Sequence, residues 1–212
     1  MRLGIFGGTF NPIHFGHLRA AEAARDLIDL DKVIFVPSGN PPLKASGLPE
    51  ASHRYAMTRI ATASNINFLM SDIEMRESSV SYTIDTVSQL RVLYPDDQLH
   101  LILGLDAFLD LPHWREPEEL IDSIDFIIIA RPGFQAADLN ASPFIEGVIS
   151  EFPDRVTSLR IRSGRTAFVT ALSAFDISST AIRRLAMEGK SIKYLLPDPV
   201  EQYILQHKLY TN

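Results

Sequence analysis

Short runs of largely apolar residues set the strongest limit on how this chain of 212 residues can fold. Strands that are covered on both faces have such runs, whereas strands with one solvent-exposed face alternate apolar and polar residues. Strands that alternate with helices along the chain favour a parallel, doubly wound sheet with right-handed crossovers. We therefore predict an α/β, Rossmann-like fold, with strands at 2–6, 33–36, 66–70, 99–103 and 126–129.

Apolar residues at helical spacing predict the covering helices. The first follows the first strand, and further helices are expected over 54–63 and 83–93. The polar, irregular stretch 133–165 predicts one short helix at 143–151. We expect a single domain over 1–212 that ends in a small C-terminal helical part from about residue 178.

The junction between the first strand and the first helix carries the sequence GGTFNPIHFGHL at residues 7–18. Helix N-termini present unpaired N–H groups and partial positive charge, and glycines let a phosphate approach that backbone. His14 and His17 lie three residues apart, so both can donate hydrogen bonds at the helix entrance. We interpret this segment as a phosphate-binding site.

Three other interpretations of this segment fit less well. The segment has neither the G-x-G-x-x-G spacing of a dinucleotide-binding fingerprint nor the G-x-x-x-x-G-K-[ST] spacing of a P-loop. A zinc site would need ligands beyond the two histidines, and the chain has no cysteine and no H-E-x-x-H helix, so no metal ligand is assigned. A glycine turn with two solvated histidines is the plain alternative, and the strand-turn-helix setting argues against it.

A second candidate phosphate element is ISSTAIRR at residues 177–184. Ser178 or Ser179 can cap the helix that follows, and ordinary capping is the alternative interpretation. Arg183 and Arg184 stand in the first turn, at the positive end of the helix dipole, where acidic residues are favoured. A polyphosphate in front of the helix would account for these cations, and Arg184 is the better candidate for a solvent-facing side chain.

Composition excludes several classes of function. The formal net charge is −6 and no long Lys/Arg block offsets it, which argues against general nucleic-acid binding. The chain has no cysteine, so disulfides and thiolate chemistry are excluded. No stretch resembles a signal peptide or is long enough to span a membrane, so we expect a cytoplasmic protein without a membrane partner. A homo-oligomer is compatible with the sequence.

The two phosphate elements resemble the paired [TH]-x-G-H and I-S-S-T-x-x-R signatures of a nucleotidyltransferase superfamily, here His14–His17 and Ile177–Arg183. Over nearly the whole chain, the segments between them are similar to the bacterial nicotinate mononucleotide adenylyltransferase family. Further segments that carry this resemblance are 37–44, 81–83, 104–106, 113–114, 131–133 and 195–203.

The resemblance implies a reaction without a protein nucleophile. A phosphate oxygen of nicotinate mononucleotide would attack the α-phosphorus of ATP in line, and pyrophosphate would leave. It implies His17, His14 and Arg183 as catalytic residues, with Mg²⁺ bridging the triphosphate. The implied ATP contacts are Gly8, Thr9, Phe10, His14, His17, Gly104, Asp106, Ile177, Ser178, Ser179, Thr180 and Arg183.

For the acceptor, the resemblance implies that Trp114 stacks on the pyridine ring. Backbone N–H groups at Thr83 and Arg115 would receive the nicotinate carboxylate, which accepts from two donors where an amide offers one acceptor. The remaining implied contacts to the mononucleotide are Asn40, Lys44 and Arg131.

The chain departs from the family pattern at two positions. Asn11 stands where many members have aspartate, and Leu43 stands where many have histidine. Three other functions stay open: a phosphopantetheine adenylyltransferase, a transferase that prefers nicotinamide mononucleotide, and a regulator that binds ATP without turning it over.

Overall fold

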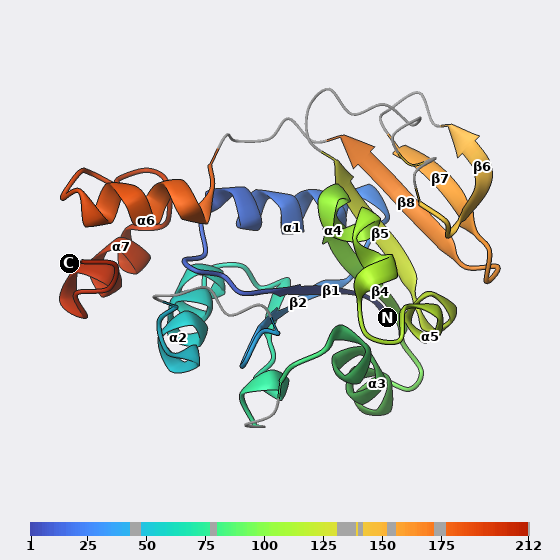
Figure 1. Ribbon diagram of the computed structural model, residues 1–212, viewed down its shortest axis with the longest axis horizontal. Helices are drawn as coiled ribbons and strands as arrows, with labels where there is room; N and C mark the ends of the chain where they lie inside the picture. Colours follow the sequence, from blue (N-terminus) through green and yellow to red (C-terminus); the bar gives the residue numbers. More distant parts are fainter. Residues whose placement is uncertain are drawn as a thin grey trace. The chain divides into compact units, whose positions relative to one another are not determined.

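The computed structural model describes residues 1–42, 48–76, 80–130, 139, 142–151, 156–171 and 177–211. Strands in the described residues form one mostly parallel sheet in the order β3-β2-β1-β4-β5-β8-β7-β6 (Figure 1). The fold class is therefore the predicted one. The strands are β1 (Arg2–Gly8), β2 (Lys32–Pro37), β3 (Phe68–Met70), β4 (Gln98–Gly104), β5 (Asp125–Ala130), β6 (Ile145–Glu151), β7 (Val156–Ile161) and β8 (Thr166–Ala171).

The chain divides into two compact units. One contains residues 1–6, 20–33 and 82–174, and the other contains residues 7–19, 34–81 and 175–212. The second unit therefore holds both signature segments, although more than 150 residues separate them in sequence. A single domain over the whole chain stays a prediction.

Three of the predicted apolar runs, at 2–6, 99–103 and 126–129, are strands of the first unit. β1 pairs with β4, β4 with β5 and β5 with β8, all in parallel. Leu101, Ile102, Phe126 and Ile127 are almost fully buried, as expected for strands covered on both faces. The runs predicted β1 to β5 to within one or two residues at each end, whereas no run predicted β7 or β8.

The helices lie close to their predicted positions. The helix expected at 54–63 spans 51–62, and the one at 83–93 has its predicted ends. No helix in the described ranges combines the length and the apolar character that a membrane crossing requires. The helices are α1 (Phe15–Leu27), α2 (Ala51–Thr62), α3 (Thr83–Leu93), α4 (Leu105–Leu109), α5 (Pro117–Ser123), α6 (Ser179–Met187) and α7 (Asp198–Gln206), with short 3₁₀ turns η1 (Ile73–Met75) and η2 (Leu111–His113).

The short helix predicted at 143–151 is wrong. Residues 145–151 form β6, which pairs antiparallel with β7, and β7 pairs antiparallel with β8 at the orange edge of the sheet in Figure 1. The β6–β7 register shifts twice, between Ile145 and Gly147 and again between Val148 and Ser150. Such irregularities break the alternation of apolar and polar residues, so the period of 2 that marks a strand was hidden.

Candidate active site

The first signature lies where β1 passes into α1, as predicted. The His14 side chain is buried, with 5% of the residue exposed, and its ring stacks on that of His17 with centroids 3.7 Å apart. The backbone N–H of His14 donates to Nδ1 of His17 over 3.3 Å. Because Nδ1 accepts this bond, the neutral His17 ring carries its proton on Nε2.

Both imidazoles are neutral at neutral pH. Burial lowers the pKa of His14 to about 4. Burial, and second the neighbouring His14, lower the pKa of His17 to about 3. Desolvation disfavours the charged form of each ring, so both histidines are neutral hydrogen-bonding groups in this structure.

Position 16 accepts only glycine unless the stacked His14 ring moves. An added Cβ would lie 2.9 Å from both Cε1 and Nδ1 of His14, and 3.6 Å from the carbonyl oxygen of Ile177. Nδ1 of His14 is buried and has no hydrogen-bond partner among the described residues. The glycine between the two histidines therefore makes the room in which the His14 ring lies.

Phe10 also packs against His17. Its ring meets that of His17 edge-on at 5.2 Å, and its backbone has a left-handed φ of 45°. A bulky residue in this region stores about 1–3 kcal/mol of strain and persists only where its surroundings hold it. Gly8 permits the arrangement, because a Cβ there would come within 3.2 Å of the Phe10 ring.

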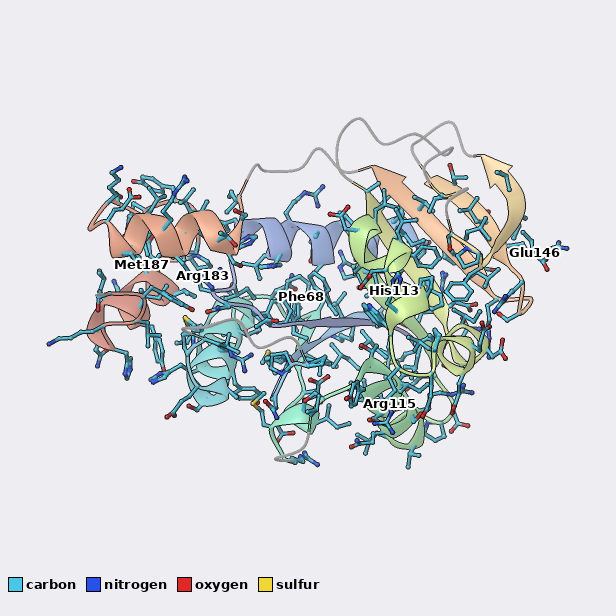
Figure 2. The ribbon with its side chains drawn as sticks, in the orientation of Figure 1. Phe68, His113, Arg115, Glu146, Arg183 and Met187 are labelled. Carbon is cyan, nitrogen blue, oxygen red and sulfur yellow. The ribbon has the colours of Figure 1, made fainter. Side chains whose placement is uncertain are left out.

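The second signature contacts the first through side-chain hydrogen bonds. Oγ of Ser179 donates to the carbonyl oxygen of Pro12 over 2.9 Å. Nη1 of Arg183, labelled on α6 in Figure 2, donates to the carbonyl oxygen of Asn11 over 2.8 Å, and Nη2 donates to Oγ1 of Thr180 over 3.2 Å. The two segments thus lie side by side. Their contacts with a phosphate stay predictions.

The start and end of α6 follow their sequence signals. The side chain of Ser178 caps the helix by accepting from the backbone N–H of Ala181 over 3.2 Å. Gly189 follows the helix with a left-handed φ of 64°, which favours glycine as a terminator. The expected first-turn position of the two arginines is wrong, because Arg183 lies past the first turn of α6 and Arg184 stands in its last turn. Arg184 is exposed, whereas Arg183 is partly buried against the Asn11 loop.

Two residues without a predicted role also hold this loop. Tyr210 donates its hydroxyl to Oδ1 of Asn11 over 2.7 Å, and burial raises the pKa of that hydroxyl. Arg54 on α2 donates to the carbonyl oxygen of Thr9 over 3.0 Å. Arg54 shares the buried stripe of α2 with Met57 and Ala61, and a charged residue within such a stripe is a signal that the sequence did contain. Tyr210 carries no comparable signal.

The loop after β2 is held against the first signature. The backbone N–H of Ser38 donates to the carbonyl oxygen of Gly8 over 2.8 Å, and Asn40 exchanges hydrogen bonds with Ser81 over 3.3 Å and 3.0 Å. A Cβ on Gly39 would lie only 1.9 Å from the carbonyl oxygen of Glu74. This places Asn40 in the same unit as His17. Two further candidates, Lys44 and Arg131, lie outside the described residues, as does Leu43.

The remaining candidates belong to the other unit. Gly104 ends β4, and Asp106 stands in the first turn of α4. The indole N–H of Trp114 donates to Oδ2 of Asp110 over 3.2 Å, and the Trp114 side chain is partly buried. Asp110 also lies 3.1 Å from Nδ1 of His113, so one carboxylate orients both rings.

Arg115 and the start of α3 lie together in this unit. The Arg115 guanidinium lies 4.7 Å from the centroid of the Tyr82 ring, and its Nη1 is 3.6 Å from Oδ2 of Asp85, beside α3 in Figure 2. Thr83 is the first residue of α3, where backbone N–H groups have no partner within the helix. The structure therefore brings the positions of Thr83 and Arg115 together. Among the described residues no three His, Asp or Glu side chains cluster as a metal site would require.

Known proteins similar to this chain share its length and its fold. A model of the cytidylyltransferase-like family matches residues 5–185. A protein of Geobacter metallireducens named "Probable nicotinate-nucleotide adenylyltransferase" is 44% identical, with 100% of this chain and 99% of that protein covered. One of the same name from a Thermoanaerobacter species is 41% identical, with 99% and 94% covered.

Solved structures agree in fold. The nicotinic acid mononucleotide adenylyltransferase of Plasmodium falciparum, complexed with NaAD, matches with a TM-score of 0.76 and 22% identity over 99% of this chain and 97% of that one. The same enzyme complexed with APC matches with a TM-score of 0.73. On the family model and the full-length relatives, the chain belongs to the cytidylyltransferase-like family and, within it, to the nicotinate-nucleotide adenylyltransferases.

Proposed function

We propose that this enzyme transfers the adenylyl group of ATP to nicotinate mononucleotide, giving nicotinic acid adenine dinucleotide and pyrophosphate. The observation that carries the proposal is the contact of Ser179 and Arg183 with the carbonyl groups of Pro12 and Asn11. Through these bonds, donors from the second signature segment hold the loop that leads into the first. The full-length relatives named nicotinate-nucleotide adenylyltransferase support the choice of acceptor.

The reaction needs positioning and charge stabilisation. An oxygen of the acceptor phosphate forms a bond to the α-phosphorus of ATP, and the bond to the oxygen bridging the α- and β-phosphorus breaks as pyrophosphate leaves. His17 donates from Nε2 to the α-phosphate, where negative charge develops, and His14 supports that ring by stacking on it. Magnesium enters with ATP as substrate, bound mainly by phosphate oxygens.

Arg183 is suited to hold the β- and γ-phosphates with Ser179 and Thr180. Its bonds to Asn11 and Thr180 use two of the five N–H donors of a guanidinium, so further donors stay available for phosphate oxygens. The hydrogen bonds also fix the direction of the guanidinium plane before substrate arrives. Preorganised donors of this kind need little rearrangement in the transition state.

In the acceptor half, we assign Trp114 to stacking on the pyridine ring, with Asp110 fixing the indole orientation. Thr83 and Arg115 offer backbone N–H groups for the nicotinate carboxylate, and Asn40, Lys44 and Arg131 are assigned to the mononucleotide. Gly8, Thr9, Phe10, Gly104, Asp106, Ile177 and Ser178 complete the proposed ATP contacts.

The test is magnesium-dependent release of pyrophosphate from ATP with three acceptors. Nicotinate mononucleotide should give the highest kcat/KM, above nicotinamide mononucleotide and phosphopantetheine. A higher value with either of the other acceptors would replace the proposed substrate. No pyrophosphate with any of the three, together with tight ATP binding, would instead identify a nucleotide-binding regulator.

A further inference from the structure

Arg54 is a buried cation between two loops. Only 1% of the residue is exposed, and among the described residues its hydrogen bonds all go to backbone carbonyl oxygens. Nη1 donates to Thr9 over 3.0 Å, Nη2 donates to Gly39 over 2.9 Å, and Nε donates to Pro49 over 3.2 Å. Burying a charge is costly unless it is well hydrogen-bonded, so a simple packing role would be served better by an apolar residue.

Two of the three carbonyl groups that accept from the guanidinium, those of Thr9 and Gly39, come one residue after the end of a backbone pairing. Ser38 donates to Gly8 over 2.8 Å, and the next residue on each side, Gly39 and Thr9, faces Arg54. Arg54 therefore spans the point at which the two segments stop bonding to each other directly. The planar guanidinium sets the separation of the loops by its own fixed geometry.

These loops have different tasks in the proposed function. Thr9 belongs to the segment assigned to ATP, and Gly39 precedes Asn40, which is assigned to the acceptor. We propose that Arg54 is a positioning residue that couples the two substrate loops, so that ATP and acceptor are held in register for in-line attack. This inference rests on the proposed function.

Other contacts hold each loop separately, which makes the coupling testable. Ser179 and Arg183 hold the loop between β1 and α1, which is assigned to ATP, at Pro12 and Asn11. The acceptor loop is held by Ser81 at Asn40. If those contacts suffice to shape both loops, loss of the guanidinium lowers stability only. If Arg54 couples the loops, its loss impairs the use of both substrates together.

The test compares Arg54→Lys and Arg54→Met with wild type. A lysine ammonium is a compact charge that lacks the fixed fork needed to serve both carbonyl groups in one geometry, and methionine has no donor. Displacing a bound reactant by about 1 Å can cost roughly a hundredfold in rate. We expect Arg54→Lys to lower kcat/KM for ATP and for nicotinate mononucleotide alike, by about 10- to 100-fold, with a greater loss in Arg54→Met.

Arg59 supplies the matched control, because it is an exposed arginine on the same helix. Arg59→Lys and Arg59→Met should keep the kcat and both KM values of wild type. Thermal unfolding of every variant shows the temperature range in which it is folded, so that kinetics are compared on folded protein. A lowered melting temperature with unchanged kcat and KM values in Arg54→Lys would overturn the coupling, as would a change confined to one substrate.

Failure of the proposed function has a different signature. Wild type and the Arg59 variants would then release no pyrophosphate with nicotinate mononucleotide. In that case the affinities of wild type and Arg54→Lys for MgATP and for nicotinate mononucleotide, measured by calorimetric titration, test whether Arg54 couples the two loops. Weaker binding of both ligands to Arg54→Lys would support the coupling, and unchanged affinity for either would refute it.

Discussion

Replacing Gly16 by alanine should separate catalysis from folding. The new Cβ would lie 2.9 Å from Cε1 and Nδ1 of His14. It would also lie 3.6 Å from the carbonyl oxygen of Ile177, which limits how far residue 16 can move away from His14. Because carbon atoms pack at about 3.5–4.0 Å, the His14 ring has to shift by about 0.6–1.1 Å. That ring stacks on His17 at 3.7 Å, so the proposed α-phosphate donor shifts with it.

The expected loss of turnover is large compared with the loss of stability. A misplacement of about 1 Å costs roughly a hundredfold in rate, which corresponds to about 2.7 kcal/mol of activation free energy. Alanine in a helix is favoured over glycine by about 1 kcal/mol, and this gain offsets part of the roughly 1–3 kcal/mol that overpacking costs. We therefore expect Gly16→Ala to stay folded while its kcat falls about a hundredfold.

The assay is pyrophosphate release at saturating ATP and nicotinate mononucleotide, with thermal unfolding measured on the same samples. Gly147→Ala is the control, because a Cβ at that position on β6 meets nothing within 4 Å. It should match wild type in kcat. Wild-type turnover in Gly16→Ala would refute the reasoning that links His14 packing to the position of His17.

His17→Ala removes the proposed Nε2 donor and should lower kcat by roughly a hundredfold or more, measured below the melting temperature of the variant; a kcat near that of wild type would exclude the assignment. Gly39→Ala cannot be accommodated beside the Glu74 carbonyl oxygen at 1.9 Å, so urea unfolding should show lower stability, by about 1–3 kcal/mol, and KM for the acceptor should rise. Tyr210→Phe removes the hydroxyl that donates to the loop amide, and the unpaired amide oxygen should cost about 1–3 kcal/mol in the same measurement. The folded-state pKa values of His14 and His17, about 4 and about 3, lie below the unfolded value of 6.5. Their contribution to stability is therefore fully present above pH 6.5 and is lost as pH falls through the folded values. The urea concentration at which half of the protein is unfolded should decrease as the pH is lowered from 7 to 4, and it should decrease less in His14→Gln. A midpoint concentration that does not change with pH would contradict the burial of these rings.

Local patterns along the chain were sufficient for β1 to β5 and for most helices, and they located the two segments that we interpret as phosphate elements. Buried parallel strands need apolar residues on both faces, so their runs are readable without a structure. The cap at Ser178 and the terminator at Gly189 are likewise properties of a few neighbouring residues. The same kind of reasoning failed at β6, where irregular pairing with β7 erased the periodic signal.

Only the tertiary structure decided which groups shape the candidate site. Arg54 and Tyr210 act through partners that the fold brings to them, and Tyr210 reaches Asn11 across 199 residues of sequence. The neutral state of His14 and His17 also depends on burial. Residue types and short spacings are written in the sequence, whereas desolvation and long-range hydrogen bonds arise only when distant segments pack together, because both depend on what surrounds a group in space.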